Sequence, residues 1–93
     1  MKLTESTIVS FPVEVGVEPD SVRFFENIEQ AAYSTGVSPD YIKRAVKNHS
    51  KDRYGYSWYM ASEVITISRG LVELGIKTKE WFNNCFSIFG LNI

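Results

Sequence analysis

Two closely spaced helix signals near the middle of this 93-residue chain constrain its fold more than any other feature. Asn27 can cap a first helix, and Gln30, three residues later, can complete a capping box. Ser38 is a second N-cap and is directly followed by a proline, which suits the first helical position. We therefore expect helices from 28 to about 34 and from 39 to about 48, joined by a short turn, which is the outline of a helix-turn-helix.

A twenty-residue helix-turn-helix frame that begins at Ile28 and ends at Lys47 places small or apolar residues at its inward positions. Ala32 falls where the two helices cross closely and only a small side chain fits, and Gly36 falls in the turn, which needs a permissive φ. The remaining inward positions are also apolar: Ala31, Val37, Ile42 and Ala45. Thr35 is less apolar than its position prefers, so it is a small departure from the frame.

The outward side of the second predicted helix is basic, although the whole chain has a formal net charge of −1 at pH 7. Residues 41–59 carry five basic side chains against Asp52, a net of +4, so the rest of the chain sums to −5. Lysine and arginine bind phosphates and guanine edges, and serine can bind several bases. We expect double-stranded DNA to contact the second helix and the loop after it through Ser38, Asp40, Lys43, Arg44, Lys47, Lys51, Arg53 and Tyr54.

Some of these residues have alternative interpretations. Asp40 can accept a hydrogen bond from a cytosine, but a first-turn charge that suits the helix dipole is the simpler interpretation. The charged block can be only a solvated face, because helix-turn-helix units also serve as scaffolds and protein docks. In the aromatic segment after the loop, alternation places Tyr56 and Trp58 on one face, which we expect in the core rather than stacked on single-stranded bases.

The remaining sequence predicts an α+β fold in one domain, residues 1–93. β-branched residues over 7–17, a turn, and a short apolar run over 22–25 indicate an N-terminal β-hairpin. A short third strand is expected at 56–60, where it can pair with the hairpin. A pair of C-terminal helices, capped by Ser62 and by Thr78, completes the predicted layout.

The C-terminal third, residues 61–93, can serve a different partner. The stretch 64–67 is rich in β-branched residues and can instead extend a strand. Cys85 lies on the apolar stripe of the last helix and is expected in the core. The same helix has more aromatic side chains than a small core is expected to bury: Trp81, Phe82, Phe86 and Phe89. An exposed patch there would bind a second copy of the chain or a host protein.

Several functional classes find no support in the residues. With Cys85 and His49 as the single cysteine and histidine, the chain cannot build an internal disulfide or a zinc site of several thiolates, and we expect no metal or cofactor. His49 is expected as a surface residue near a helix end. No apolar run is long enough for a membrane span, and no signal peptide is recognisable, so we expect a cytoplasmic protein. No serine–histidine–acid set or phosphate loop is present, so we expect no enzyme.

Residues 12–60 resemble the NUMOD-type modular DNA-binding domains that accompany phage and intron homing endonucleases. The family pattern combines a strand pair, a phrase like F-x-S-I-x-E-A-A, a G-V-S, an isoleucine in the second helix and a basic loop that ends in G-Y-x-W. The matching segments are Phe25-Glu26-Asn27-Ile28-Glu29-Gln30-Ala31-Ala32, Gly36-Val37-Ser38, Ile42 and Gly55-Tyr56-Ser57-Trp58. Glu29 and Gln30 depart from the family, which commonly has a basic residue followed by glutamate there.

The resemblance implies a DNA-binding module without a nuclease, since the residue sets of the GIY-YIG and HNH nucleases are missing. It also implies a phage or prophage origin. From the helix-turn-helix frame and the basic block we expect a small phage regulator, for example of transcription, or an accessory factor. The alternative is a phage interaction module that docks on a host protein, such as RNA polymerase or a DNA-associated factor, and inhibits it.

Overall fold

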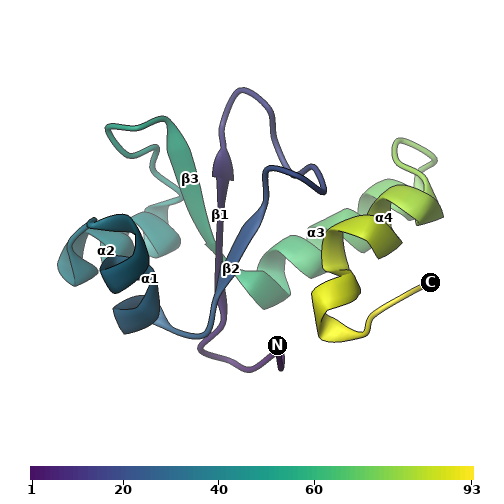
Figure 1. Cartoon of the computed structure of the whole chain (residues 1–93). Helices are drawn as coiled ribbons and strands as arrows, with labels where there is room; N and C mark the ends of the chain where they lie inside the picture. Colours follow the sequence, from purple (N-terminus) through teal and green to yellow (C-terminus); the bar gives the residue numbers. More distant parts are fainter.

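The chain folds into three layers, with a small antiparallel sheet between two pairs of helices (Figure 1). The structure is a computed structural model that describes all 93 residues. The predicted α+β class is confirmed, and none of the helices is long and apolar enough to cross a membrane. In chain order the elements are β1 (Ile8–Pro12), β2 (Arg23–Phe25), α1 (Ile28–Thr35), α2 (Pro39–Asn48), β3 (Tyr56–Met60), α3 (Ala61–Glu73), α4 (Lys79–Phe86) and the 3-10 turn η1 (Ser87–Phe89).

Strand β1 is central in the sheet, whose order is β2-β1-β3. The predicted N-terminal hairpin forms, with Ile8 opposite Phe25. The third strand pairs with the other edge of β1, where Ser10 lies opposite Trp58. Strand β2 precedes the helix-turn-helix and β3 follows it, and both pair with β1. Strand β1 therefore holds both ends of that unit against one sheet.

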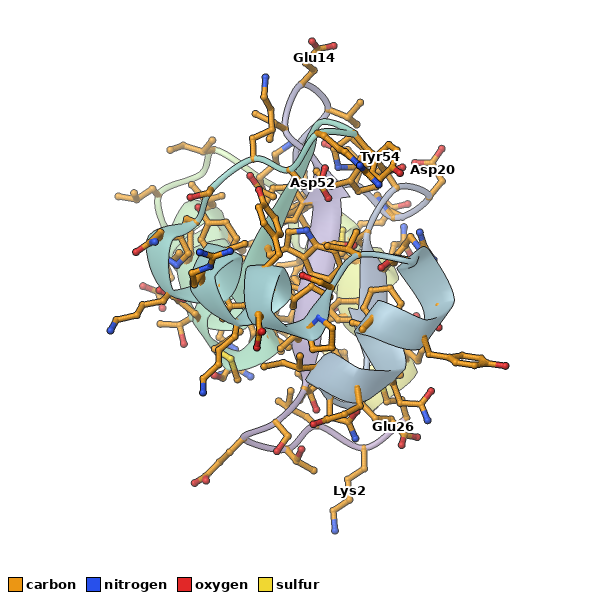
Figure 2. All side chains as sticks on the ribbon, turned by 90° about the vertical axis from the view of Figure 1, so that its left-hand side faces the viewer. Lys2, Glu14, Asp20, Glu26, Asp52 and Tyr54 are labelled. Atoms are coloured by element: carbon orange, nitrogen blue, oxygen red, sulfur yellow. The ribbon has the colours of Figure 1, made fainter.

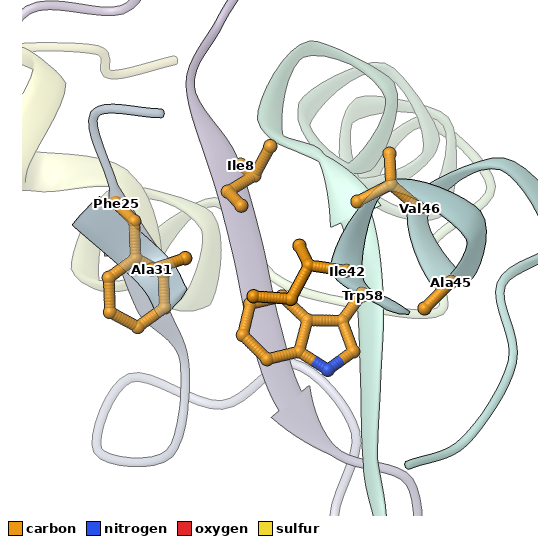
Figure 3. Close-up of a cluster of buried hydrophobic side chains, with 7 residues drawn as sticks. All are labelled: Ile8, Phe25, Ala31, Ile42, Ala45, Val46 and Trp58. Carbon is orange, nitrogen blue, oxygen red and sulfur yellow. The ribbon is translucent and has the colours of Figure 1, made fainter. Parts of the chain in front are cut away.

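Alternation along the strands divides the apolar side chains between the two faces of the sheet. Ile8 points toward α1 and α2, whereas its neighbour Val9 points toward α3 and α4. The first core, on the α1/α2 face, consists of Ile8, Phe25, Ala31, Ile42, Ala45, Val46 and Trp58 (Figure 3). The second core, on the α3/α4 face, consists of Val9, Val64, Ile65, Phe82, Cys85 and Phe86. Both cores therefore depend on the same central strand.

The first two helices begin and turn where the sequence predicted. The Asn27 side chain accepts a hydrogen bond from the backbone N–H of Gln30 at 2.8 Å. The expected reciprocal bond from the Gln30 side chain does not form. Gly36 adopts φ 76° and donates to the carbonyl of Ala32, which ends α1. Ser38 caps α2 by accepting from the N–H of Tyr41 at 3.2 Å.

The C-terminal helical pair is present, but the prediction that Ser62 caps its first helix is wrong. Helix α3 begins at Ala61, directly after β3, and Met60 at the N-cap makes no side-chain bond. The N–H of Ala61 donates instead to the carbonyl of Thr7, so the sheet supplies the partner that a cap would. The stretch 64–67 is helical and does not extend a strand. Thr78 caps α4 as predicted.

The aromatic side chains of α4 do not form the exposed patch that the sequence led us to expect. Phe82 and Phe86 are completely buried in the second core, as Cys85 nearly is. Trp81 is half-buried, and its indole N–H donates to the carbonyl of Val17 at 3.0 Å. The sheet also contributes aromatic rings to this face, and one of them, Phe24, packs against Phe86 of α4 and Phe89 of η1. The strands thus supply the burial that the helix alone cannot.

Candidate nucleic-acid interface

The helix-turn-helix is packed through the small side chains of its frame. Ala31, Ile42 and Ala45 are buried between the helices and the sheet, as predicted, and Ala32 and Val37 pack at the margin of the first core. The two helices can approach closely because alanine adds little beyond the backbone.

Thr35, the departure from the frame, has a role in the turn. Its hydroxyl donates to the carbonyl of Ala31 at 2.7 Å and accepts from the N–H of Val37 at 3.2 Å. The second bond gives a partner to the N–H of Val37 in the turn after α1, and the first adds a donor to a carbonyl in the last turn of the helix. A polar residue at this position therefore stabilises the connection between the helices.

The outward face of α2 carries three exposed cations, Lys43, Arg44 and Lys47. Lys43 and Lys47 are four residues apart and so lie on one side of the helix. None of the three forms an ion pair: the ion pair of the molecule joins Lys77 to Glu18, and the other close contact of a basic side chain with a carboxylate joins His49 to Glu63. The positive charge on this face is therefore available to an external anion.

The N-terminal end of α2 exposes Ser38 and Asp40 beside these cations. The Ser38 hydroxyl already accepts the capping bond, but it keeps its proton as a donor. Asp40 lies in the first turn and makes no ion pair, which is consistent with the dipole interpretation.

The loop that follows α2 is organised by Asp52, a role that the sequence did not reveal. The Asp52 side chain is buried, with 6% of the residue exposed. One carboxylate oxygen accepts from the N–H groups of Tyr54 and Tyr56 at 2.8 and 3.0 Å, and the other accepts from the indole N–H of Trp58 at 3.0 Å. The backbone closes the same turn, since the N–H of Gly55 donates to the Asp52 carbonyl. We call residues 51–55 the Asp52 loop.

The Asp52 loop is fastened beside the N-terminal half of α2. The Tyr41 hydroxyl donates to the carbonyl of Lys51 at 3.0 Å. At the tip, Arg53 and Tyr54 are exposed, and the Arg53 guanidinium lies 4.9 Å from the centre of the Tyr54 ring. Figure 2, which looks onto the α1/α2 face, shows Asp52 and Tyr54 above the two helices. The loop and the start of α2 thus lie side by side.

A groove of about 330 Å³ separates the loop from the helix-turn-helix. Its lining residues come from the turn and the start of α2 on one side and from the Asp52 loop on the other: Gly36, Val37, Ser38, Tyr41, Asp52, Arg53 and Tyr54. Ser38, Arg53 and Tyr54, three of the predicted contact residues, therefore surround one concave surface.

Acidic side chains flank the basic surface. Glu14 and Asp20 are exposed beyond the Asp52 loop, and Glu26 is exposed at the opposite end, below the helices in Figure 2. A nucleic acid on this face would be repelled at these flanks, so the favourable contact is confined to α2 and the Asp52 loop.

His49 lies at the end of α2 and is partly exposed, as expected, and it also makes contacts that the sequence did not predict. It ends α2 with φ 57°, its ring stacks on Tyr59 with centroids 3.9 Å apart, and its Nε2 atom lies 3.1 Å from a carboxylate oxygen of Glu63. The residue is partly exposed, but it connects α2 to α3 around the edge strand β3. Only the folded chain brings these three residues together.

Cys85, the group that could serve as a nucleophile, is buried in the second core, whereas the cations of α2 are exposed on the other helical layer. Burial raises the pKa of the Cys85 thiol to about 11, and the nearby Glu18 carboxylate adds to the effect while Lys77 opposes it. The thiol is therefore neutral near pH 7, a poor state for a nucleophile. No three histidine, cysteine or acidic side chains gather where they could hold a metal ion.

Comparisons with protein-family models, with curated proteins and with solved structures found no match to this chain. The resemblance of residues 12–60 to NUMOD-type domains therefore stays a prediction based on the residues that match the pattern.

Proposed function

We propose that the protein binds double-stranded DNA by inserting α2 into the major groove. The observation that carries the proposal is the row of exposed, unpaired cations Lys43, Arg44 and Lys47 on the second helix of a helix-turn-helix. Recognition helices of this motif read base edges from the major groove, and their basic residues also neutralise phosphates.

The proposed role is regulation of transcription by a small phage or prophage protein in the host cytoplasm. The NUMOD-like segments support a phage origin and a module that binds DNA without cutting it, and regulation is a role that such a module can serve without a nuclease. The neutral, buried Cys85 is consistent with a role that needs no chemistry at the site.

A charge-reversal experiment tests the proposal. Fluorescence anisotropy with labelled random duplex DNA, at two salt concentrations, compares the wild type with a Lys43→Glu, Lys47→Glu double variant. The variant should bind more weakly, and its salt dependence should be shallower. Each lost phosphate contact makes the negative slope of log K against log salt less steep by about 0.9.

The matched control is a Lys2→Glu, Lys79→Glu variant, which changes the net charge equally at two exposed sites away from α2. It should stay close to the wild type. Equal DNA affinity of the wild type and the α2 variant would refute the proposal. An equal loss of affinity in both variants would show that binding depends only on net charge and not on α2.

A second candidate function is protein docking, favoured by apolar side chains exposed after α3. Leu74 is 76% exposed and Ile76 is 63% exposed, in the turn between α3 and α4. They replace the α4 aromatic residues as the proposed contact with a host protein or a second copy. If the second copy is the partner, Leu74→Asp with Ile76→Asp should convert a dimer into a monomer in light scattering, whereas a monomeric wild type would contradict it.

A further inference from the structure

The groove between α2 and the Asp52 loop points to a second DNA contact on the other side of one DNA strand. We propose that the sugar–phosphate strand lies in this groove, with α2 in the major groove and the loop tip in the adjacent minor groove. Arg53 would then read the width and the A·T content of the minor groove. This inference rests on the proposed function, and it assigns the loop a specificity role in place of phosphate binding alone.

The shape of the groove supports the strand as its occupant. In a duplex, one sugar–phosphate strand separates the major groove from the minor groove. A protein that enters both grooves at neighbouring positions must therefore straddle that strand. The two walls here are the start of α2, with Ser38 and Tyr41, and the loop tip, with Arg53 and Tyr54.

The loop is built in a way that favours a defined contact over a mobile basic arm. The three hydrogen bonds to the Asp52 carboxylate hold the tip from within, and the Tyr41–Lys51 bond ties it to α2. Burying a carboxylate is unfavourable unless its oxygens are paired. These bonds fix the position of the two exposed side chains at the tip, Arg53 and Tyr54. Nonspecific attraction to phosphates would not need such a fixed position.

The chemistry of the tip fits a minor groove. A·T-rich tracts have a narrow minor groove with enhanced negative potential, which attracts arginine. The guanidinium is planar and weakly hydrated, so it loses less hydration free energy than a lysine ammonium when it enters a narrow groove. The Tyr54 ring beside Arg53 holds the guanidinium at the tip of the loop.

The acidic groups around the groove are compatible with this placement. The Asp52 carboxylate lines the groove, but its oxygens are occupied by three donors and little of it is exposed. The exposed Glu14 and Asp20 lie beyond the loop, where they would limit how far the duplex extends past the tip.

The test is a selection from a random duplex library, followed by binding to the selected site with altered flanks. The wild type should select a core sequence with an A·T-rich flank on one side. Replacing that flank with G·C should weaken binding about tenfold, because the guanine amino group protrudes into the minor groove. Inosine·C pairs, which lack that amino group, should restore binding although they change the major groove.

Two variants with the full chain separate a minor-groove contact from a phosphate contact. Arg53→Ala should lose the discrimination among the three flanks and keep the preference for the core sequence. Lys51→Ala, the matched control in the same loop, should weaken binding equally for all three. Unchanged unfolding midpoints would show that both variants are folded.

The outcomes distinguish the two proposals. If the wild type binds the core sequence but treats A·T, inosine·C and G·C flanks alike, the groove inference is wrong and the proposed function stands. The same holds if Arg53→Ala keeps full flank discrimination. If the wild type binds no duplex at all, both are wrong.

Discussion

The two helical layers bury comparable sets of side chains against the same sheet, yet they present different surfaces outward. The α1/α2 layer exposes three unpaired cations on α2 and continues into the basic Asp52 loop. The α3/α4 part, residues 61–93, has three basic and three acidic residues, and its two most exposed large apolar side chains, Leu74 and Ile76, lie in the turn between the helices. The inward residues of both layers obey the same packing physics, so the difference in proposed function lies entirely in the outward residues.

The layers also differ in how they fill their cores. The first core uses small side chains between two helices and two stacked rings, Phe25 and Trp58, and the indole N–H of Trp58 is bound to Asp52. The second core uses several aromatic rings, among them Phe82 and Phe86 with centroids 4.8 Å apart. Small residues permit the close helix crossing of the helix-turn-helix, whereas large rings fill the space between α4 and the sheet.

The largest expected effect comes from Phe82→Ala, which asks whether the two layers unfold as one unit. Removing this buried ring should lower the free energy of unfolding by about 3–5 kcal/mol. Because β1 supplies neighbouring residues to both cores, the α1/α2 face should also unfold at a lower urea concentration. In a Trp81→Phe background, Trp58 fluorescence reports on that face during urea unfolding. An unchanged Trp58 midpoint, with helicity lost earlier, would indicate two independent units.

The second prediction concerns the thiol of the α3/α4 layer. Burial raises the pKa of Cys85 from an ordinary value of 9.0 to about 11, so the folded thiol keeps its proton as the pH rises toward 11. At pH 8 its thiolate fraction should be about a hundredfold lower than in the unfolded chain. Alkylation by iodoacetamide should therefore be at least that much slower in buffer than in urea. Equal rates would place the thiol in solvent and contradict the packing of the second core.

The third prediction concerns the corresponding polar group of the α1/α2 layer. Asp52→Asn should lower the free energy of unfolding by about 1–3 kcal/mol, because the new amide would turn an N–H group toward a backbone or indole N–H. Urea unfolding measures the change. Asp20→Asn, an exposed carboxamide control, should stay within about 0.5 kcal/mol of the wild type. Equal stability of the two variants would mean that the three bonds contribute nothing net.

The smallest effects come from a glycine in each layer, and they should have opposite signs. Gly36 has φ 76°, so alanine there should destabilise the helix-turn-helix by about 1 kcal/mol through backbone strain. Gly70 lies inside α3 with open space around an added Cβ, so alanine there should stabilise by about 0.5–1 kcal/mol. Thermal unfolding of both variants checks the signs. A Gly36→Ala variant as stable as Gly70→Ala would show that the turn tolerates other backbone conformations.

Much of the candidate site was predictable because its signals are local. The caps at Asn27 and Ser38, the turn at Gly36 and the outward cations of α2 all depend on residues within a few positions of each other. Such signals persist whatever the rest of the chain does, since capping and helix periodicity act over about one turn. Double-stranded DNA as the partner, and the residues proposed to contact it, stay predictions until binding is measured.

The errors arose where a partner comes from a distant part of the chain. Ser62 was expected as a cap, but strand pairing carries β3 directly into α3. The α4 aromatic rings were expected to exceed the core, but the second face of the sheet covers them. His49 lies at the end of α2 as expected, but its contacts with Tyr59 and Glu63 were not predicted.

By itself the sequence determined the α+β class, the helix-turn-helix and the basic side of α2, because these follow from local capping, periodicity and side-chain charge. The tertiary structure decided what surrounds α2. It turned Asp52 from one acidic residue in a basic stretch into the buried carboxylate that holds the loop. It also formed the groove between that loop and the helix-turn-helix. The three donors to Asp52 lie only two to six positions away in the chain, so the tertiary structure adds the burial of that carboxylate and not its hydrogen bonds. The groove needs the loop after α2 to return beside the turn before α2, and no short stretch of sequence encodes the approach of two segments.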